Sequence, residues 1–156
     1  MRAPADLPFA TTLLVRDACL CLHAQRAARA LARRFDIALK PAGLTSGQFS
    51  LLMSLNRPQP AKLSAVAALL AMDRTTVTAN LKPLERRGLV ETAVDQADKR
   101  ARLLLLTPAG RSVLAEAAPI WRHVHAAIET TLSDPDHLRA ELNALSRSDH
   151  QDGAAG

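Results

Sequence analysis

Apolar residues recur at helical spacing over most of this 156-residue chain. From about Thr11 to Leu39 their period is close to about 3.6 residues, which predicts one long amphipathic helix. Pro41 and Gly43 follow at once and end the predicted helix, because both residue types interrupt helical backbone. The apolar stripe of this helix comprises Leu14, Cys21, Ala28, Leu31, Ala32, Phe35 and Leu39.

Two shorter helices are predicted next, and each begins at a capping residue. "LTSGQFSLLMSL" has Thr45 as the N-cap and Gln48 three residues later, which is the spacing of a capping box. In "KLSAVAALLAM", Ser64 is the predicted N-cap, because a serine hydroxyl can accept a bond from a free helix N–H. The side of this second helix predicted to face inward carries Leu63, Val66, Ala67 and Leu70.

The stretch "AMDRTTVTANLKPLERRGLV", residues 71–90, predicts a third helix, capped by Asp73 and stopped by Gly88. On a helical wheel its larger apolar side chains share one side, which is predicted to face the core: Val77, Leu81 and Leu84. The opposite side and its flanks are small, hydroxylic and basic: Arg74, Thr75, Thr76, Thr78, Ala79, Lys82 and Arg86.

After Gly88 the apolar period changes from helical to alternating. "LVETAV" and "ARLLLLT" predict two strands, joined by the charged hairpin tip "DQADKR". Thr107 followed by Pro108 predicts the start of another long helix, and Asp134 precedes a last one. The predicted fold is therefore mainly α with a small β-hairpin wing, and its central part has the order of a winged helix-turn-helix.

Composition narrows the partner classes without selecting one. The formal net charge of +5 suits a polyanion, although a membrane surface or simple solubility explains it equally well. No apolar run approaches the roughly 20 residues that span a bilayer, and no signal-peptide cleavage site is evident. Two cysteines make a disulfide scaffold improbable, so the cytoplasm is the expected compartment and no membrane partner is expected.

The basic face of residues 71–90 suggests contact with duplex DNA. A small surface lets a helix enter the major groove, where threonine and basic side chains reach bases and phosphates. A face of this kind is also common as a plain solvent face, and a charged hairpin tip is often only a solvated turn. The position of Lys99, Arg100 and Arg102 directly after the helix favours a wing that reaches a neighbouring minor groove.

With these segments in order, the chain resembles the MarR family of bacterial transcription regulators over about residues 14–145. The matching stretches are "LTSGQFSLL", "LSAVAALLAMDRTTVTANLKPLERRGLV", "DQADKR" and "LLLLTPAGR". The resemblance implies a homodimeric repressor on a palindromic operator, with Arg100 in the minor groove and Asp98 orienting it. The predicted DNA-binding residues are Arg74, Thr75, Thr76, Thr78, Lys82, Arg86, Asp98, Lys99, Arg100 and Arg102.

The organisation predicted from these patterns has five parts. Residues 1–10 form a flexible arm, 11–43 an N-terminal dimerisation helix and 44–106 the winged helix-turn-helix DNA-binding domain. Residues 107–148 form the C-terminal dimerisation helices, and 149–156 a flexible tail. The outer helices carry more apolar surface than the small central module can cover, which also favours a dimer.

The resemblance further implies a small-molecule inducer such as an aromatic acid, held between the dimer helices and the DNA-binding domain. The residues expected to line that pocket, each of which could instead serve only in packing, are His23, Arg26, Phe49, Met53 and Trp121.

A thiol-based redox sensor is an alternative signal, because some relatives sense peroxide through a cysteine in the first helix. Cys19 is expected on the polar side of that helix near basic residues, which can make a thiol reactive. Cys21 is expected in the core, and packing of both cysteines competes with the redox interpretation.

Other functional classes find little support in the sequence. No phosphate-binding loop, dinucleotide-binding turn, zinc-protease motif or nucleophile elbow is present, so no enzyme activity and no cofactor are expected. No metal site is expected, since neither Cys19 and Cys21 nor His123 and His125 are spaced to chelate within one helix. A winged helix that binds protein rather than DNA remains a second alternative.

Overall fold

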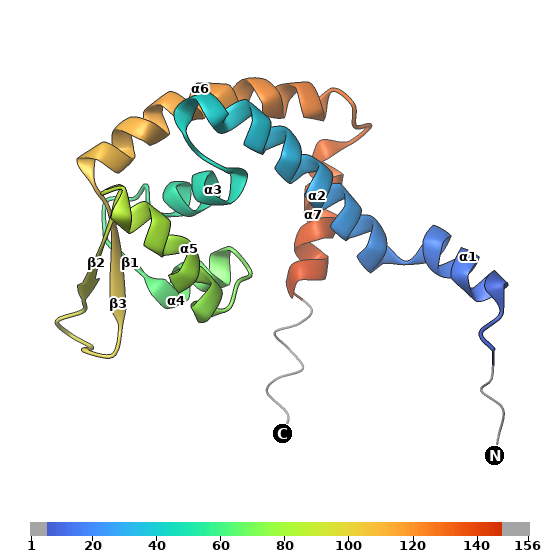
Figure 1. Cartoon of the computed structure of the whole chain (residues 1–156), viewed down its shortest axis with the longest axis horizontal. Coiled ribbons are helices and arrows are strands. Elements are labelled where there is room, and N and C mark those ends of the chain that lie inside the picture. Colours follow the sequence, from blue (N-terminus) through green and yellow to red (C-terminus); the bar gives the residue numbers. More distant parts are fainter. Residues whose placement is uncertain (1–5, 148–156) are drawn as a thin grey trace, which may run out of the picture.

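Two long helices cross above a small winged module in the computed structural model, which describes residues 6–147 (Figure 1). Helix α2 (Leu20–Leu39) and helix α6 (Pro108–Glu129) form this upper layer. The winged module lies beneath their crossing ends, α1 (Phe9–Ala18) extends away from the body, and α7 (Pro135–Arg147) descends from the far end of α6. The proposed tail and half of the proposed N-terminal arm lie outside the described residues.

The prediction of one continuous N-terminal helix is wrong, because the helix is interrupted at Cys19, between α1 and α2. Cys19 has φ −72° and ψ 108°, which is extended backbone, and it serves as the N-cap of α2. Its Sγ accepts a hydrogen bond from the Leu22 N–H at 3.5 Å. A one-residue interruption hardly alters the apolar period on either side, so the pattern could not reveal it.

The winged module is built from short elements in the order η1 (Lys40–Ala42), α3 (Ser46–Ser54), β1 (Ala61–Lys62), α4 (Leu63–Leu69), α5 (Arg74–Arg86), β2 (Val90–Val94) and β3 (Arg102–Leu106). The capping box of Thr45 and Gln48 is confirmed, as is the cap of α5 by Asp73. The prediction that Ser64 caps α4 is wrong, since the N-cap is Lys62 and makes no side-chain bond. Lys62 itself ends β1, where it pairs with Leu103 of β3, so α4 begins directly after it at Leu63.

The sheet has three antiparallel strands in the order β1-β3-β2, one more than the predicted hairpin. Leu104 at the centre of β3 pairs with Ala61 on one side and Thr92 on the other. A strand of two residues leaves no alternating pattern, so β1 could not be found by periodicity. It anchors the start of α4 to the base of the wing.

The hydrophobic core lies between the winged module and the inner ends of α2 and α6. Leu39, Leu52, Val77 and Leu84 are fully buried there, each with 0% of its surface exposed. The predicted inward side of α5 is confirmed, because Leu81 is also buried beside Val77 and Leu84. The opposite face of α5 is therefore fixed toward solvent.

Helix α6 joins the winged module through a close backbone contact. Thr107 caps α6, its N–H donates to the Leu89 carbonyl at 3.1 Å, and its hydroxyl donates to the Gly88 carbonyl at 2.7 Å. Gly110 lies so close to Leu89 that an added Cβ would sit 2.2 Å from the same carbonyl oxygen. The turn between α5 and β2 is thus tied directly to the first turn of α6.

The two outer helices, α1 and α7, bury none of their residues within this chain. Large apolar side chains along them are exposed: Phe9, Leu14, Val15, Leu138, Leu142 and Leu145. Among residues 6–147, no helix combines the length and apolar character needed to cross a membrane.

Two carboxylates at helix starts give the fold a predicted dependence on acidic pH. Asp73 accepts from the Thr76 N–H at 2.7 Å, and Asp36 of α2 accepts from the Ser46 N–H at 2.6 Å. These bonds hold the pKa of each carboxyl below its ordinary value. Their contribution to stability is therefore complete above about pH 4 and is lost as the pH falls through the lowered folded pKa.

We expect the melting temperature to decrease as the pH is lowered from about 4 to about 2. The decrease is expected to be less steep in the double variant Asp36→Asn/Asp73→Asn. Thermal unfolding followed by circular dichroism measures this. Glu141→Gln is the control, since that exposed carboxylate bonds to no side chain in the described part of the chain. Equal pH slopes in the double variant and the original protein would contradict the assignment.

Candidate nucleic-acid interface

The outward face of α5 presents the basic and hydroxylic side chains that the sequence predicts there. Arg74, Thr75, Thr78, Lys82 and Arg86 are all exposed, opposite the buried apolar side of the helix. Asp73 caps α5, and Arg74 in the first turn of this helix lines a hollow together with the wing residues Arg100 and Arg102. The helix presents only small side chains between its cations, which suits insertion into a groove.

The three threonines of α5 differ in what their hydroxyls can do. Thr76 donates to the Asp73 carboxylate at 2.8 Å, and Thr78 donates to the Arg74 carbonyl at 2.8 Å. Both hydroxyl protons are therefore engaged within the helix. The Thr75 side chain bonds to nothing within residues 6–147, which leaves it the freest of the three to contact another molecule.

The tip of the wing is shaped by side chains that bond to its own backbone. Asp95 accepts from the Ala97 N–H at 2.9 Å, and Asp98 accepts from the Arg100 N–H at 3.0 Å. Asp98 thus bonds to the main chain of Arg100, while the guanidinium of Arg100 has no ion pair with the described residues. Arg102 folds back and donates to the Lys99 carbonyl at 3.3 Å.

A hollow of about 200 Å³ lies where the wing, the start of α4 and the start of α5 meet. It brings together four cations and one carboxylate, and a serine hydroxyl completes its polar lining: Lys62, Arg74, Arg100, Arg102, Asp98 and Ser64. A cleft lined by one sign of charge focuses the electric field and attracts an anionic partner such as the DNA backbone.

Sequence reasoning missed Lys62 and Ser64 as members of this surface. Lys62 lies in β1, and its Nζ stands 3.8 Å from a carboxylate oxygen of Asp95, the first residue after β2. That contact holds the wing beside α4. In the sequence, a lysine and a serine flank Leu63, but their position beside the wing follows only from the pairing of β1 with β3.

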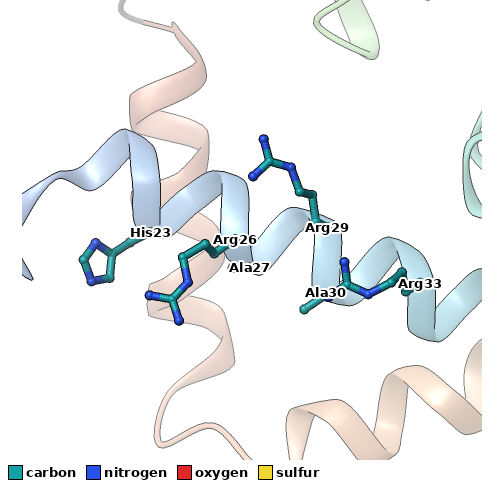
Figure 2. A pocket seen from close by; sticks show the side chains of 6 residues that line it. All are labelled: His23, Arg26, Ala27, Arg29, Ala30 and Arg33. Carbon is teal, nitrogen blue, oxygen red and sulfur yellow. The ribbon is translucent and has the colours of Figure 1, made fainter. Parts of the chain in front are cut away.

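The residues expected to line a ligand pocket fall into two separate hollows of this chain, and their role in ligand binding stays a prediction. Phe49, Met53 and Trp121 line an apolar hollow of about 470 Å³. His23 and Arg26 line a different, cationic hollow of about 510 Å³ on α2, and Figure 2 shows their side chains there with Arg29 and Arg33. On the helical wheel of α2, Arg26 and Arg33 face away from the partly buried Phe35 and the buried Leu39, which separates the cationic hollow from the core.

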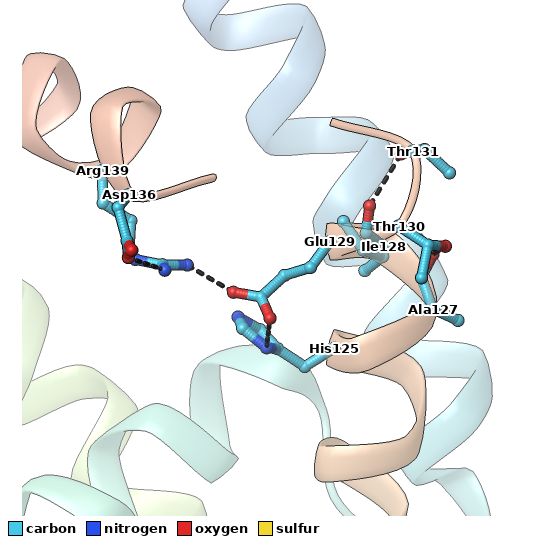
Figure 3. Close-up of polar contacts among 8 residues, drawn as sticks. All are labelled: His125, Ala127, Ile128, Glu129, Thr130, Thr131, Asp136 and Arg139. Atoms are coloured by element: carbon cyan, nitrogen blue, oxygen red, sulfur yellow. Dashed lines mark hydrogen bonds and ion pairs between the residues drawn. The ribbon is translucent and has the colours of Figure 1, made fainter. Parts of the chain in front are cut away.

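A chain of contacts runs from the apolar hollow into the junction of α6 and α7. The Phe49 and Trp121 rings stack with centroids 6.2 Å apart, and Trp121 stacks on His125 at 4.6 Å. His125 Nδ1 lies 3.7 Å from Glu129, which pairs with Arg139 of α7 at 2.6 Å (Figure 3). The indole is therefore held from behind by groups of two helices.

The cysteines do not occupy the positions predicted for them. Cys19 is the partly buried N-cap of α2 rather than a residue on the polar side of a continuous helix. Cys21, expected in the core, is exposed in this chain, and its Sγ accepts from Gln25 Nε2 at 3.2 Å. It was misplaced because the stripe was drawn through the break at Cys19. A redox role for Cys19 stays a prediction.

A basic helix set beside an arginine-tipped wing defines the class of winged-helix DNA-binding proteins. The model of the MarR family matches residues 44–101. The transcriptional repressor MprA of Escherichia coli K12 is 32% identical over an alignment of 160 residues, which covers 95% of this chain and 85% of MprA. The transcriptional activatory protein BadR of Rhodopseudomonas palustris is 33% identical over 129 residues, covering 76% of this chain and 73% of BadR.

Solved structures agree with the sequence relatives. The transcriptional regulator MosR of M. tuberculosis, crystallised in complex with DNA, shares 36% identity and a TM-score of 0.78. That likeness covers 85% of this chain and 96% of the MosR chain. The protein belongs to the MarR family. It is a DNA-binding transcriptional regulator with a winged helix-turn-helix fold, as the sequence predicts.

Proposed function

We propose that this protein is a cytoplasmic, homodimeric repressor that binds a palindromic operator and releases it when a small aromatic effector binds. The observation that carries the proposal is the cationic hollow between the wing and the first turns of α4 and α5. Four cations from three segments converge there on one concave surface. Convergence of this kind distinguishes a binding surface from a helix face that is merely solvated.

The proposed docking follows from the elements that carry these residues. Helix α5 enters the major groove with Thr75 and Arg74 toward base edges, and Lys82 and Arg86 toward phosphates. Arg100 at the wing tip, flanked by Lys99, reaches the minor groove. Lys62 and Ser64 approach the backbone between the two grooves.

A second copy is proposed to cover the apolar faces of α1 and α7. These helices expose Phe9, Leu14, Leu138 and Leu142, and isolated amphipathic helices of 10 and 13 residues are marginal in water without packing. Closed two-fold symmetry would present two α5 helices and two wings to one face of DNA, which matches a palindromic operator.

Lys82→Ala tests a phosphate contact by α5. Loss of one phosphate contact lowers the slope of log affinity against log salt concentration by about 1, because one fewer counterion is released. Binding to an operator selected from genomic fragments is measured by fluorescence anisotropy between 50 and 200 mM salt, a range over which about 6–10 contacts change affinity strongly.

Lys40→Ala is the matched control for Lys82→Ala, since Lys40 is an exposed lysine of η1 outside the proposed interface. Its slope is expected to equal that of the original protein. An unchanged slope for Lys82→Ala would remove Lys82 from the interface. Retention of no genomic fragment at low salt would overturn the proposed function itself.

A further inference from the structure

We infer that the apolar hollow beside Trp121 selects neutral planar aromatic molecules and discriminates against aromatic carboxylates. The inference rests on the proposed function, because it specifies the effector of the proposed repressor. It differs from the aromatic acid that family resemblance implies, and the difference comes from the position of the cations in this chain.

The walls of the hollow suit a flat apolar molecule. Trp121 and Phe49 line the hollow as a stacked pair with an interplanar angle of 18°, and Met53 provides a polarizable thioether. Leu69 and Leu70 of the α4 end close another side. Leu69 is 70% exposed and Met53 38% exposed, so a molecule seated here would cover apolar surface that this chain leaves in water.

None of the seven residues that line the hollow carries a charge: Phe49, Ser50, Met53, Ser54, Leu69, Leu70 and Trp121. A carboxylate placed among them would lose hydration without gaining a cation, which is costly. The basic residues expected to pair with an acid, His23 and Arg26, line the separate hollow on α2. The cation needed to hold an aromatic acid is therefore absent from these walls.

The charged groups behind Trp121 do not supply the missing cation. Arg139 is already held between Glu129 and Asp136, and His125 turns its Nδ1 toward Glu129 (Figure 3). Glu129, Asp136 and Arg139 together contribute two carboxylates and one guanidinium. Their net negative charge opposes an anion on the other side of the indole.

The two serines offer a neutral polar contact instead. The Ser54 hydroxyl donates to the Leu51 carbonyl at 2.7 Å, which leaves its oxygen as an acceptor. The exposed Ser50 hydroxyl makes no bond with the described residues. A phenol, amide or ester can use these groups without bringing a charge into the hollow.

The test compares 2-naphthamide with 2-naphthoate, which share a ring system and differ in charge. Calorimetric titration of the full-length protein at pH 7.5 without DNA is expected to show the amide binding at least about tenfold more tightly. Met53→Lys places a cation at the mouth of the hollow and is expected to shift the ratio toward the naphthoate by about tenfold. Arg33→Ala, in the cationic hollow of α2, is expected to leave the ratio unchanged.

Equal or tighter binding of the naphthoate by the original protein would overturn the inference, as would binding of neither probe at millimolar concentration. A ratio unmoved by Met53→Lys, or moved by Arg33→Ala, would place binding elsewhere and overturn it too. Operator binding by the same preparation is measured separately. A protein that retains DNA but fails these titrations therefore keeps the proposed regulatory function and loses only the effector class.

Discussion

Arg100→Ala is expected to weaken operator binding by between about 10- and 100-fold, with little change in thermal stability. The side chain lies at the tip of the wing, is exposed, and has no ion pair with the described residues. Its removal therefore leaves the fold intact but deletes a charge from a site predicted to enter the minor groove, where narrow A·T-rich segments concentrate negative potential. Fluorescence anisotropy with a labelled operator at 150 mM salt measures the loss.

Arg122→Ala is the control for Arg100→Ala, because it removes the same charge from an exposed position on α6. Its operator affinity is expected to stay within about twofold of the original protein, since exposed charges more than about 10 Å from the DNA are screened at this salt concentration. Equal losses in both variants would show a general charge effect. Equal affinity of Arg100→Ala and the original protein would exclude Arg100 from the interface.

The wing geometry explains why Arg100 and Arg102 are not equivalent. Arg102 begins β3 and donates back to the Lys99 carbonyl, whereas the Arg100 guanidinium extends from the tip without such a bond. Asp98 sets the path of the main chain at Arg100 through its carboxylate. The sequence predicted all three on one hairpin, but only the fold shows that Arg102 bonds back to the tip while the Arg100 guanidinium forms no ion pair with the described residues.

Local signals predicted most of the helix starts and the wing. Thr45, Asp73 and Thr107 each cap the helix that the sequence assigns to them, because a cap depends on residues within one turn. The errors occur where a feature depends on distant pairing. Lys62 is the N-cap of α4 because β1, which pairs with β3, ends at this residue, and Cys19 interrupts a helix whose apolar period continues on both sides.

In the candidate sites too, local features could be predicted from the sequence, whereas features that depend on packing between distant segments could not. The exposed face of α5 could be predicted because the wheel separates it from Val77 and Leu84. The apolar hollow beside Trp121 could be predicted only in part, through Phe49, Met53 and Trp121, because its walls come from α3, the end of α4 and the middle of α6. A list of lining residues drawn from sequence combined Phe49 and Trp121 with His23 of α2, which the packing of α2 turns toward another surface.

For an effector bound beside Trp121 to change DNA affinity, as proposed, α6 and the winged module have to move as connected parts. Trp121 and Thr107 belong to the same helix, α6. The first turn of that helix is bonded to the turn that follows α5, through the carbonyls of Gly88 and Leu89. Under the proposed function, an effector that displaced α6 from beside Trp121 would act on the end of α5 through these backbone hydrogen bonds rather than through a loose linker.

Gly110→Ala is expected to destabilise the protein by about 3 kcal/mol or more, because overpacking at a fixed backbone contact forces neighbours to move. The added Cβ would lie 2.2 Å from the Leu89 carbonyl oxygen and 2.8 Å from Leu106 Cδ1. Relief of the first contact requires the backbone to shift, which disrupts the bond from the Thr107 N–H to the same carbonyl. At fixed protein concentration the melting temperature should fall by about 10 °C.

Gly47→Ala is the matched control for Gly110→Ala, since Gly47 also lies in a helix but an added Cβ there meets nothing within 4 Å. Alanine at such a position is expected to raise stability by up to about 1 kcal/mol. The two substitutions are chemically identical, so their opposite signs isolate the close approach of α6 to the turn after α5. A Gly110→Ala protein that melts at the original temperature would show that this junction yields at no cost, and that α6 cannot act on α5 by this route.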